Sequence, residues 1–276
     1  MDLGDIPPIT KLYLVGAVAT SAAVQCNLVT PLQLYFTYRS AFEHGQLWRV
    51  VTCFLYWGPL SLDFFFHVFF IMRYSKMLEE SSFHGRRADY VWLLLVSCAL
   101  LLILSPLSPS PFLSSPLSFA LVYLWSRLNP SVRLSLFGIL TITAPYLPYA
   151  LCLFSWALSG SGAGGGGVLG GWGLGVIVSD LLGIAAGHWW YFWTEIWKRE
   201  RASGGRNWLE TPRILVKLLD PPSRLLELEA ADRARAELMR QRDAAERDER
   251  EQRRAAAAAV AATAGAAAGG GGAGHP

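Results

Sequence analysis

Residues 171–188 read GWGLGVIVSDLLGIAAGH, and this stretch decides the fold of the chain. Small residues recur in it at every fourth position: Gly171, Gly175, Ser179, Gly183 and Gly187. On an α-helix this spacing forms one flat stripe, along which a neighbouring helix can approach closely where lipid supplies no hydrophobic drive for association. The spacing therefore predicts a closely packed membrane helix. His188 follows the stripe directly, so we expect it to point towards the packed interior.

Long stretches without charge indicate that lipid surrounds most of the chain. They cover residues 12–38, 90–126 and 134–179. A water-exposed surface normally carries roughly a quarter or more of its residues as charge, whereas this chain is 53% hydrophobic and 16% charged. Nine basic and nine acidic residues lie in residues 224–254 alone, so the remainder is poorer still. This composition excludes a soluble globular domain.

The uncharged stretches accommodate six membrane spans, since a helix of about 20 apolar residues crosses a bilayer core of about 30 Å. We expect an all-α, polytopic bundle with spans at residues 11–28, 50–72, 90–104, 112–126, 134–158 and 171–197. Four prolines between residues 106 and 116 separate the third span from the fourth. The glycine run 160–167 separates the fifth from the sixth.

Positive charge in the loops predicts the orientation of the spans. Lys and Arg gather after the second, fourth and sixth spans, whereas the opposite side has only Arg39 and Arg49. Both termini are therefore expected in the cytosol. The net charge of +3 is too small to indicate nucleic acid. The four cysteines lie in apolar stretches and imply no disulfide framework.

The C-terminal part has a different character. Residues 224–254 carry equal numbers of basic and acidic side chains at three- and four-residue spacings, which favours a solvated helix. After Arg254 the chain is almost entirely Ala and Gly, too poor in apolar bulk to require a fold. We therefore expect a six-span membrane domain at residues 1–219. A cytosolic tail at 220–276 would contain the charged helix, followed by a disordered end.

Polar side chains within a membrane are costly, so each is a functional candidate. Asp63 and His67 are four residues apart and would share one helix face, where a structural polar pair is the simplest interpretation. Asp180 lies in the sixth span, with His188 two turns further along. Neither aspartate follows a Gly-x-Gly, which excludes a diaspartyl intramembrane protease. We predict no catalytic residue, no cofactor site and no metal site.

Trp48 and Arg49 lie in the long loop between the first two spans. One interpretation is an interfacial anchor, with the indole among lipid headgroups and the guanidinium on lipid phosphate. The other is a loop that lies half within the bilayer. The sequence leaves both interpretations open.

A serine protease of the rhomboid type needs an activated serine in its fourth span and a histidine base in its sixth. His188 is available, and Ser115 and Ser118 lie near the start of the fourth span. Neither serine lies in a Gly-x-Ser-Gly motif. An active rhomboid-type intramembrane serine protease stays the alternative function. A channel or transporter would show internal repeats, which the two halves of the chain lack.

Residues 73–90, RYSKMLEESSFHGRRADY, resemble the second cytosolic-side loop of Derlins, the rhomboid-related pseudoproteases of the endoplasmic reticulum. Further landmarks of that family occur in the same order over roughly residues 5–219: QLWR at 46–49, LDF at 62–64, YLWS at 123–126, NP at 129–130, PYLP at 145–148 and DLLG at 180–183. By position, Trp48 and Arg49 match the WR motif of the family. Gly183 and Gly187 match its GxxxG motif.

The resemblance implies a rhomboid-like fold in the endoplasmic-reticulum membrane and a non-proteolytic role in endoplasmic-reticulum-associated degradation. Derlins recognise misfolded lumenal or membrane proteins and aid their retrotranslocation to the cytosol. The implied partners are these misfolded clients, a membrane ubiquitin ligase complex, the valosin-containing AAA ATPase and the lipid bilayer, with a possible homo- or hetero-oligomer. Many animal Derlins dock the ATPase through a terminal segment that contains Phe. No Phe follows Phe192 here, so that docking motif is not seen.

The short third and fourth spans suggest a physical mechanism beside this resemblance. Helices shorter than the hydrocarbon thickness thin the bilayer around them. Thinner lipid lowers the cost of moving polar backbone across, because each unsatisfied group in hydrocarbon costs several kcal/mol. We expect the intramembrane polar residues Asp63, His67, Asp180 and His188 to mark a wet path for an unfolded chain.

Overall fold

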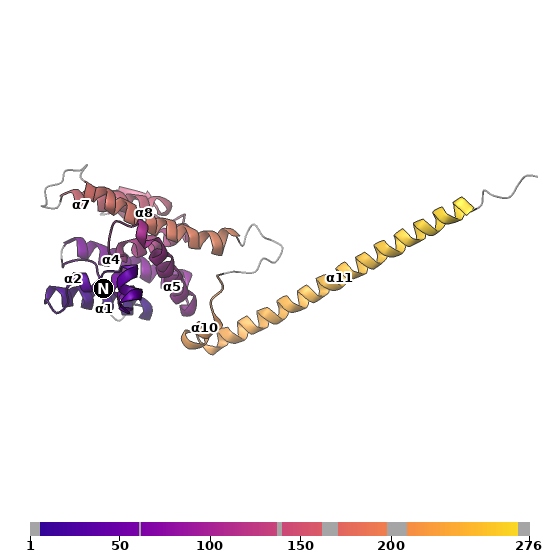
Figure 1. Ribbon diagram of the computed structural model, residues 1–276, viewed down its shortest axis with the longest axis horizontal. Coiled ribbons are helices and arrows are strands. Elements are labelled where there is room, and N and C mark those ends of the chain that lie inside the picture. The colour runs from indigo at the N-terminus through magenta and orange to yellow at the C-terminus, as the bar shows by residue number, and fades with distance from the viewer. Residues whose placement is uncertain (1–5, 61, 137–139, 162–170, 198–208, 270–276) are drawn as a thin grey trace, which may run out of the picture. The chain divides into compact units, whose positions relative to one another are not determined.

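The computed structural model describes residues 6–60, 62–136, 140–161, 171–197 and 209–269 (Figure 1). It divides into two compact units, Met1–Asp220 and Pro221–Pro276. Within the described residues, the regular secondary structure is helical except for one short β-hairpin. The predicted all-α class is therefore confirmed, with the hairpin as an exception.

The first half of the larger unit consists of helices joined by short irregular turns. These are α1 (Pro8–Gln25), α2 (Pro31–Leu34), the π-helical turn η2 (Arg39–Glu43), α3 (Arg49–Leu55), α4 (Leu62–Met77) with its π-helical extension η3 (Leu78–Ser82), and α5 (Arg87–Leu104) with a 3-10 extension η4 (Ser105–Leu107).

The second half contains the hairpin and the remaining helices. These are α6 (Ser114–Leu128), β1 (Arg133–Leu136), β2 (Leu140–Thr143), the 3-10 turn η5 (Ala144–Tyr146), α7 (Leu147–Ser161), α8 (Gly171–Tyr191) with its π-helical extension η6 (Phe192–Ile196), and α10 (Arg213–Leu219).

The second predicted span, residues 50–72, is not one helix. It is divided into α3 and α4, and the chain between them is extended or bent. Gly58 in this interval has a φ of +92°, a conformation that side chains other than glycine rarely adopt, and Pro59 follows it. The single-span prediction was wrong because apolar composition alone does not show where the backbone turns.

The fifth predicted span, residues 134–158, begins too early. Its first part forms the antiparallel hairpin, in which Arg133 pairs with Thr143 and Leu136 with Leu140. The strands read RLSL and LTIT, an alternation of apolar and polar residues that favours a strand over a helix. The helix α7 starts only at Leu147.

Helix α6 lies at the centre of the larger unit. Twelve of its fifteen residues are buried, and it contacts α4, α7 and, most extensively, α8. Trp125 near its C-terminal end is 1% exposed and packs at 5.1 Å, ring centre to ring centre, against Tyr74 of α4. Its side chains are mainly apolar or small and uncharged up to Ser126, as expected for a helix surrounded by others.

By length and composition, one helix in the described ranges is able to cross a membrane, namely Arg87–Leu107, which joins α5 to its 3-10 extension. The six-span count therefore stays a prediction. The prediction of a short third span at residues 90–104 was wrong, because the helix begins before Tyr90 and continues past Leu104.

The smaller unit consists of the helix α11 (Pro222–Gly269). Exposed ion pairs between side chains four residues apart run along it, for example Glu229 with Arg233 at 3.6 Å. The helix extends beyond Arg254, where the sequence-based helix ended, into the alanine run. Alanine has the highest intrinsic helix propensity of all residues, which accounts for this continuation.

Candidate functional site

The glycines of the α8 stripe lie against the backbone of α6. A Cβ atom at Gly183 would lie 2.1 Å from the carbonyl oxygen of Pro116, and one at Gly187 would lie 2.7 Å from that of Ala120. A Cβ atom at Gly175 would meet only the Pro109 side chain, at 3.3 Å. The two helices therefore approach so closely around Gly183 and Gly187 that no side chain fits between them.

Asp180 lies at this interface and is fully buried. The hydroxyl of Ser115 on α6 donates a hydrogen bond of 2.8 Å to its Oδ1. One turn further along α6, Ser118 donates to the backbone carbonyl of Ser115 at 3.0 Å. Because a buried carboxylate is costly unless it is hydrogen-bonded, the Ser115 hydroxyl contributes to holding Asp180 between the helices.

His188 is exposed and does not point into the packed interior, so that prediction was wrong. Its Nδ1 lies 2.7 Å from the hydroxyl of Tyr123, and the two rings meet edge to face with centres 5.8 Å apart. Arg127 donates from Nε to the same hydroxyl at 3.0 Å. A residue directly after the stripe lies about 100° further around the helix, which turns His188 away from the glycine face.

The serine and histidine of the protease alternative have different partners. The Ser115 hydroxyl bonds to Asp180, and the His188 imidazole bonds to Tyr123. Asp180 and His188 are eight residues apart on one helix, which corresponds to about 12 Å along its axis. The described structure therefore does not bring the imidazole to the hydroxyl as a dyad would require.

The Arg49 side chain holds the first loop together. The residue is 9% exposed, and its guanidinium donates from Nη1 to the carbonyls of Leu32 at 2.6 Å and Tyr35 at 2.9 Å. Nε donates to the Gln46 side chain at 2.5 Å. The interpretation that places Arg49 on lipid phosphate is therefore wrong. Trp48 is 55% exposed, as an interfacial anchor would be.

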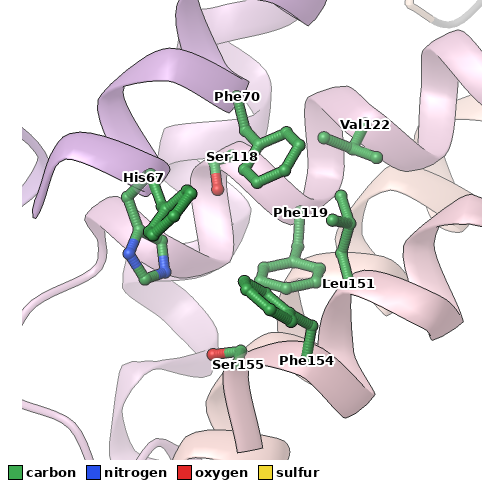
Figure 2. A pocket seen from close by; sticks show the side chains of 9 residues that line it. His67, Phe70, Ser118, Phe119, Val122, Leu151, Phe154 and Ser155 are labelled. Atoms are coloured by element: carbon green, nitrogen blue, oxygen red, sulfur yellow. The ribbon is translucent and has the colours of Figure 1, made fainter. Parts of the chain in front are cut away.

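A cavity of about 30 Å³ lies between α4, α6 and α7. Figure 2 shows the polar atoms of His67, Ser118 and Ser155 on one side of it, and Val122 and Leu151 on the other. The remaining walls are phenylalanine rings: Phe66, Phe70, Phe119 and Phe154. A space of this size with polar atoms on one side has room for about one water molecule.

Asp63 lies in the first turn of α4, but its side chain is outside the described residues. Its pairing with His67 therefore stays a prediction. Within the described ranges, no group of three His, Cys, Asp or Glu side chains is placed to hold a metal ion.

The carboxylate of Glu79 caps the N-terminal end of α1. This buried residue was not identified from the sequence. Glu79 accepts hydrogen bonds from the backbone N–H groups of Ile9 at 3.2 Å and Thr10 at 2.9 Å, and from the Thr10 hydroxyl at 2.8 Å. Ser75 links Thr10 to the Tyr90 hydroxyl through bonds of 2.8 and 2.5 Å. The first turn of a helix has unsatisfied N–H groups and a positive dipole end, both of which favour a carboxylate. The only sequence feature that drew attention to Glu79 was its place in residues 73–90, the stretch that resembles Derlins.

The family model described as "Der1-like family" matches residues 6–213 of this chain. The chain belongs to the Der1-like family. The match includes the larger unit up to the first residue of α10, and it does not include α11.

Individual relatives of the Der1-like chain agree with this assignment. Its alignment with Derlin-2 of Oryza sativa subsp. japonica is 38% identical over 224 residues and covers 77% of this chain and 83% of the relative. The chain is 34% identical over 223 residues to the probable derlin-2 homolog of Dictyostelium discoideum, covering 78% and 81%. Derlin-1.1 of Zea mays is 32% identical over 216 residues, covering 78% and 82%.

Proposed function

We propose that this protein is a non-proteolytic component of endoplasmic-reticulum-associated degradation that binds misfolded lumenal or membrane proteins and aids their retrotranslocation to the cytosol. Membership of the Der1-like family supports a rhomboid-like role in this process in general terms. The proposal places residues 1–219 in the endoplasmic-reticulum membrane as six spans, with both termini and the tail 220–276 in the cytosol.

One observation carries the non-proteolytic part of the proposal. Ser115 donates its hydroxyl proton to Asp180, while His188 bonds to Tyr123. The Ser115 hydroxyl is therefore paired with a carboxylate, whereas the serine of a rhomboid-type protease requires a histidine base within hydrogen-bond reach. Labelling of the purified protein by a fluorophosphonate probe that is lost in a Ser115→Ala or His188→Ala variant would overturn this part.

The cavity between α4, α6 and α7 supports the client-binding part. It combines aromatic walls with the polar groups of His67, Ser118 and Ser155. The lining is mainly aromatic and suits an apolar side chain of an unfolded client, whose entry would require the surrounding rings to move because the cavity holds about one water molecule. We propose that clients enter between α4 and α7, where phenylalanine rings rather than glycines make the contact.

Helix length supports the membrane-thinning part. Helices α6 and α7 contain fifteen residues each, which is about 22 Å at 1.5 Å per residue and less than the roughly 30 Å of a hydrocarbon core. A bilayer adapts to a short helix by thinning. We propose that the lipid around α6 and α7 is thinner than elsewhere, which would ease the passage of polar backbone.

The proposal is tested by following the turnover of a misfolded lumenal reporter in cells that have the double variant Gly183→Leu and Gly187→Leu as their only copy. Separation of α8 from α6 is expected to stop the turnover. The control variant is Gly175→Ala, whose added carbon meets only a proline side chain. Gly45 is not used as a control position because its φ of 66° disfavours any side chain. Normal turnover by the double variant, at equal protein level, would contradict the proposal.

The proposed partners are a membrane ubiquitin ligase complex and the valosin-containing AAA ATPase. They are tested by co-purification from mildly solubilised membranes, with the full chain and with a chain that lacks residues 224–276. Recruitment of the ATPase through the tail predicts that only the full chain retains it.

A further inference from the structure

Three polar side chains meet at the C-terminal end of α6, away from the Asp180 interface. The Tyr123 hydroxyl lies 3.0 Å from Nε of Arg127 and 2.7 Å from Nδ1 of His188. The Arg127 guanidinium also lies over the Tyr123 ring, 5.1 Å from its centre. One buried tyrosine therefore holds a cation and an imidazole on either side of its hydroxyl.

The direction of these hydrogen bonds follows from the donors. An arginine N–H only donates, so the Tyr123 oxygen accepts from Arg127 and keeps its own proton as a donor. The bond to His188 depends on the imidazole tautomer, and we infer the tautomer in which Nδ1 accepts the Tyr123 proton. The neutral imidazole then carries its proton on Nε2. Because the His188 side chain is exposed, this N–H is directed away from Tyr123 and is available to an acceptor.

Arg127 has donors to spare as well. Nε is occupied by Tyr123, and Tyr149 is a second hydrogen-bonding neighbour of the guanidinium. The guanidinium has five N–H donors, so some of those on the terminal nitrogens remain available. Within the described ranges, no carboxylate forms an ion pair with Arg127. The Tyr149 oxygen accepts from the guanidinium, and its own O–H is left as a further donor on a residue that is 47% exposed.

A guanidinium fork, an imidazole N–H and a phenol together match the oxygens of a phosphate group. In the topology proposed above, this end of α6 lies at the cytosolic surface of the membrane, where lipid phosphates are found. Trp189 and Trp193, with ring centres 6.3 Å apart, lie near His188 on the same stretch of α8 and η6, as side chains at a headgroup layer often do.

We propose that Arg127, His188 and Tyr149 bind the phosphate of an anionic phospholipid at the cytosolic surface, with Tyr123 as the residue that positions the first two. The placement at the surface rests on the proposed function. The donor set itself rests on the observed hydrogen bonds.

The full-length protein in detergent tests this proposal, with binding of dioctanoyl phosphatidic acid measured by calorimetry. Loss of a charge-assisted hydrogen-bond donor usually weakens binding by about tenfold or more, and Arg127→Gln is expected to do so. Arg133→Gln removes the same charge from the exposed strand β1 and is expected to leave the affinity within about twofold. Tyr123→Phe keeps the ring and is expected to give an intermediate loss, because both donors lose their alignment.

Equal affinities for the Arg127→Gln and Arg133→Gln proteins would overturn the proposal. If Arg127→Gln does not fold, the affinities of His188→Gln and Tyr123→Phe are compared with that of Arg133→Gln instead. Equal affinities would again overturn the proposal. Dioctanoylglycerol, which has no phosphate, is expected not to compete. Inorganic phosphate that competes as tightly as the lipid would overturn the assignment to a phospholipid. The measurement uses purified protein, so its outcome is independent of the reporter turnover.

Discussion

The two sides of α6 are packed in opposite ways. Towards α8, Gly183 and Gly187 bring backbone against backbone, and a single added carbon would lie 2.1 or 2.7 Å from a carbonyl oxygen. Towards α4 and α7, phenylalanine rings surround a cavity of about 30 Å³ with polar atoms on one side (Figure 2). Helix α6 therefore touches α8 backbone to backbone, whereas its contact with α4 and α7 encloses a cavity.

This difference indicates which contact is able to change. Backbone atoms cannot rotate out of the way, so the α6–α8 contact keeps one geometry. Phenylalanine rings can change rotamer, and a cavity reduces the cost of doing so. We infer that a client would displace side chains between α4 and α7, whereas α8 stays attached to α6.

The largest expected effect comes from adding one carbon to the α6–α8 contact. We expect Gly183→Ala to lower the free energy of unfolding by about 3 kcal/mol or more, because its Cβ would overlap a backbone oxygen. Gly187→Ala should cost about 1–2 kcal/mol, and Gly175→Ala, which meets a proline side chain, less than about 1 kcal/mol. Denaturant titration in detergent measures all three. Equal losses at the three positions would show that the backbone approach does not dominate.

The second expected effect concerns the polar group in the same contact. Ser115→Ala removes a donor from the buried carboxylate of Asp180, which typically costs about 1–3 kcal/mol. Ser118→Ala removes a hydroxyl whose acceptor is a backbone carbonyl and should cost about 1 kcal/mol or less. The same titration compares them, and a larger loss for Ser118→Ala would place the important hydroxyl on the cavity side.

The third expected effect concerns the cavity. Ser155→Leu should fill it and reduce photocrosslinking to a misfolded client several-fold, while the free energy of unfolding changes by less than about 1.5 kcal/mol. Ser131→Leu, at an exposed position after α6, is the matched control. Unchanged crosslinking in a folded Ser155→Leu protein would place the client elsewhere.

The smallest expected change in stability comes from an exposed ion pair in α11. Glu229→Ala breaks an exposed ion pair with Arg233 in α11. Such pairs contribute about 0.3–0.5 kcal/mol, and salt screens them. Thermal unfolding of the full chain should therefore hardly change, and a shift as large as that of Ser115→Ala would show that α11 takes part in the fold of the larger unit.

Several features of the fold were predictable from local sequence. Helical periodicity and missing charge predicted the all-α class, and the four-residue spacing of small residues predicted a close neighbour for residues 171–188. The interruption at Gly58 was not predicted, because it depends on one φ value of +92°. The hairpin at residues 133–143 was also missed, because an apolar count does not distinguish alternating from continuous patterns.

The candidate site was predictable only as a set of residues. Asp180, His188 and Arg49 were identified as polar groups in an apolar chain. The direction of His188 was wrong, and so was the phosphate contact of Arg49, because a guanidinium finds its acceptors among the carbonyls of another segment. Glu79 was overlooked because its partners, at the start of α1, are nearly seventy residues away in the chain.

The sequence by itself determined the properties that depend on composition and spacing: an apolar helical chain, a charged terminal helix and a stripe of small residues. Only the tertiary structure decided which polar groups meet. Ser115 and Asp180 are 65 residues apart, as are Tyr123 and His188. A hydrogen bond needs an acceptor within about 3 Å, and that distance is set by the packing of helices remote in the chain. The glycines that allow α6 and α8 to touch are therefore what brings these pairs together.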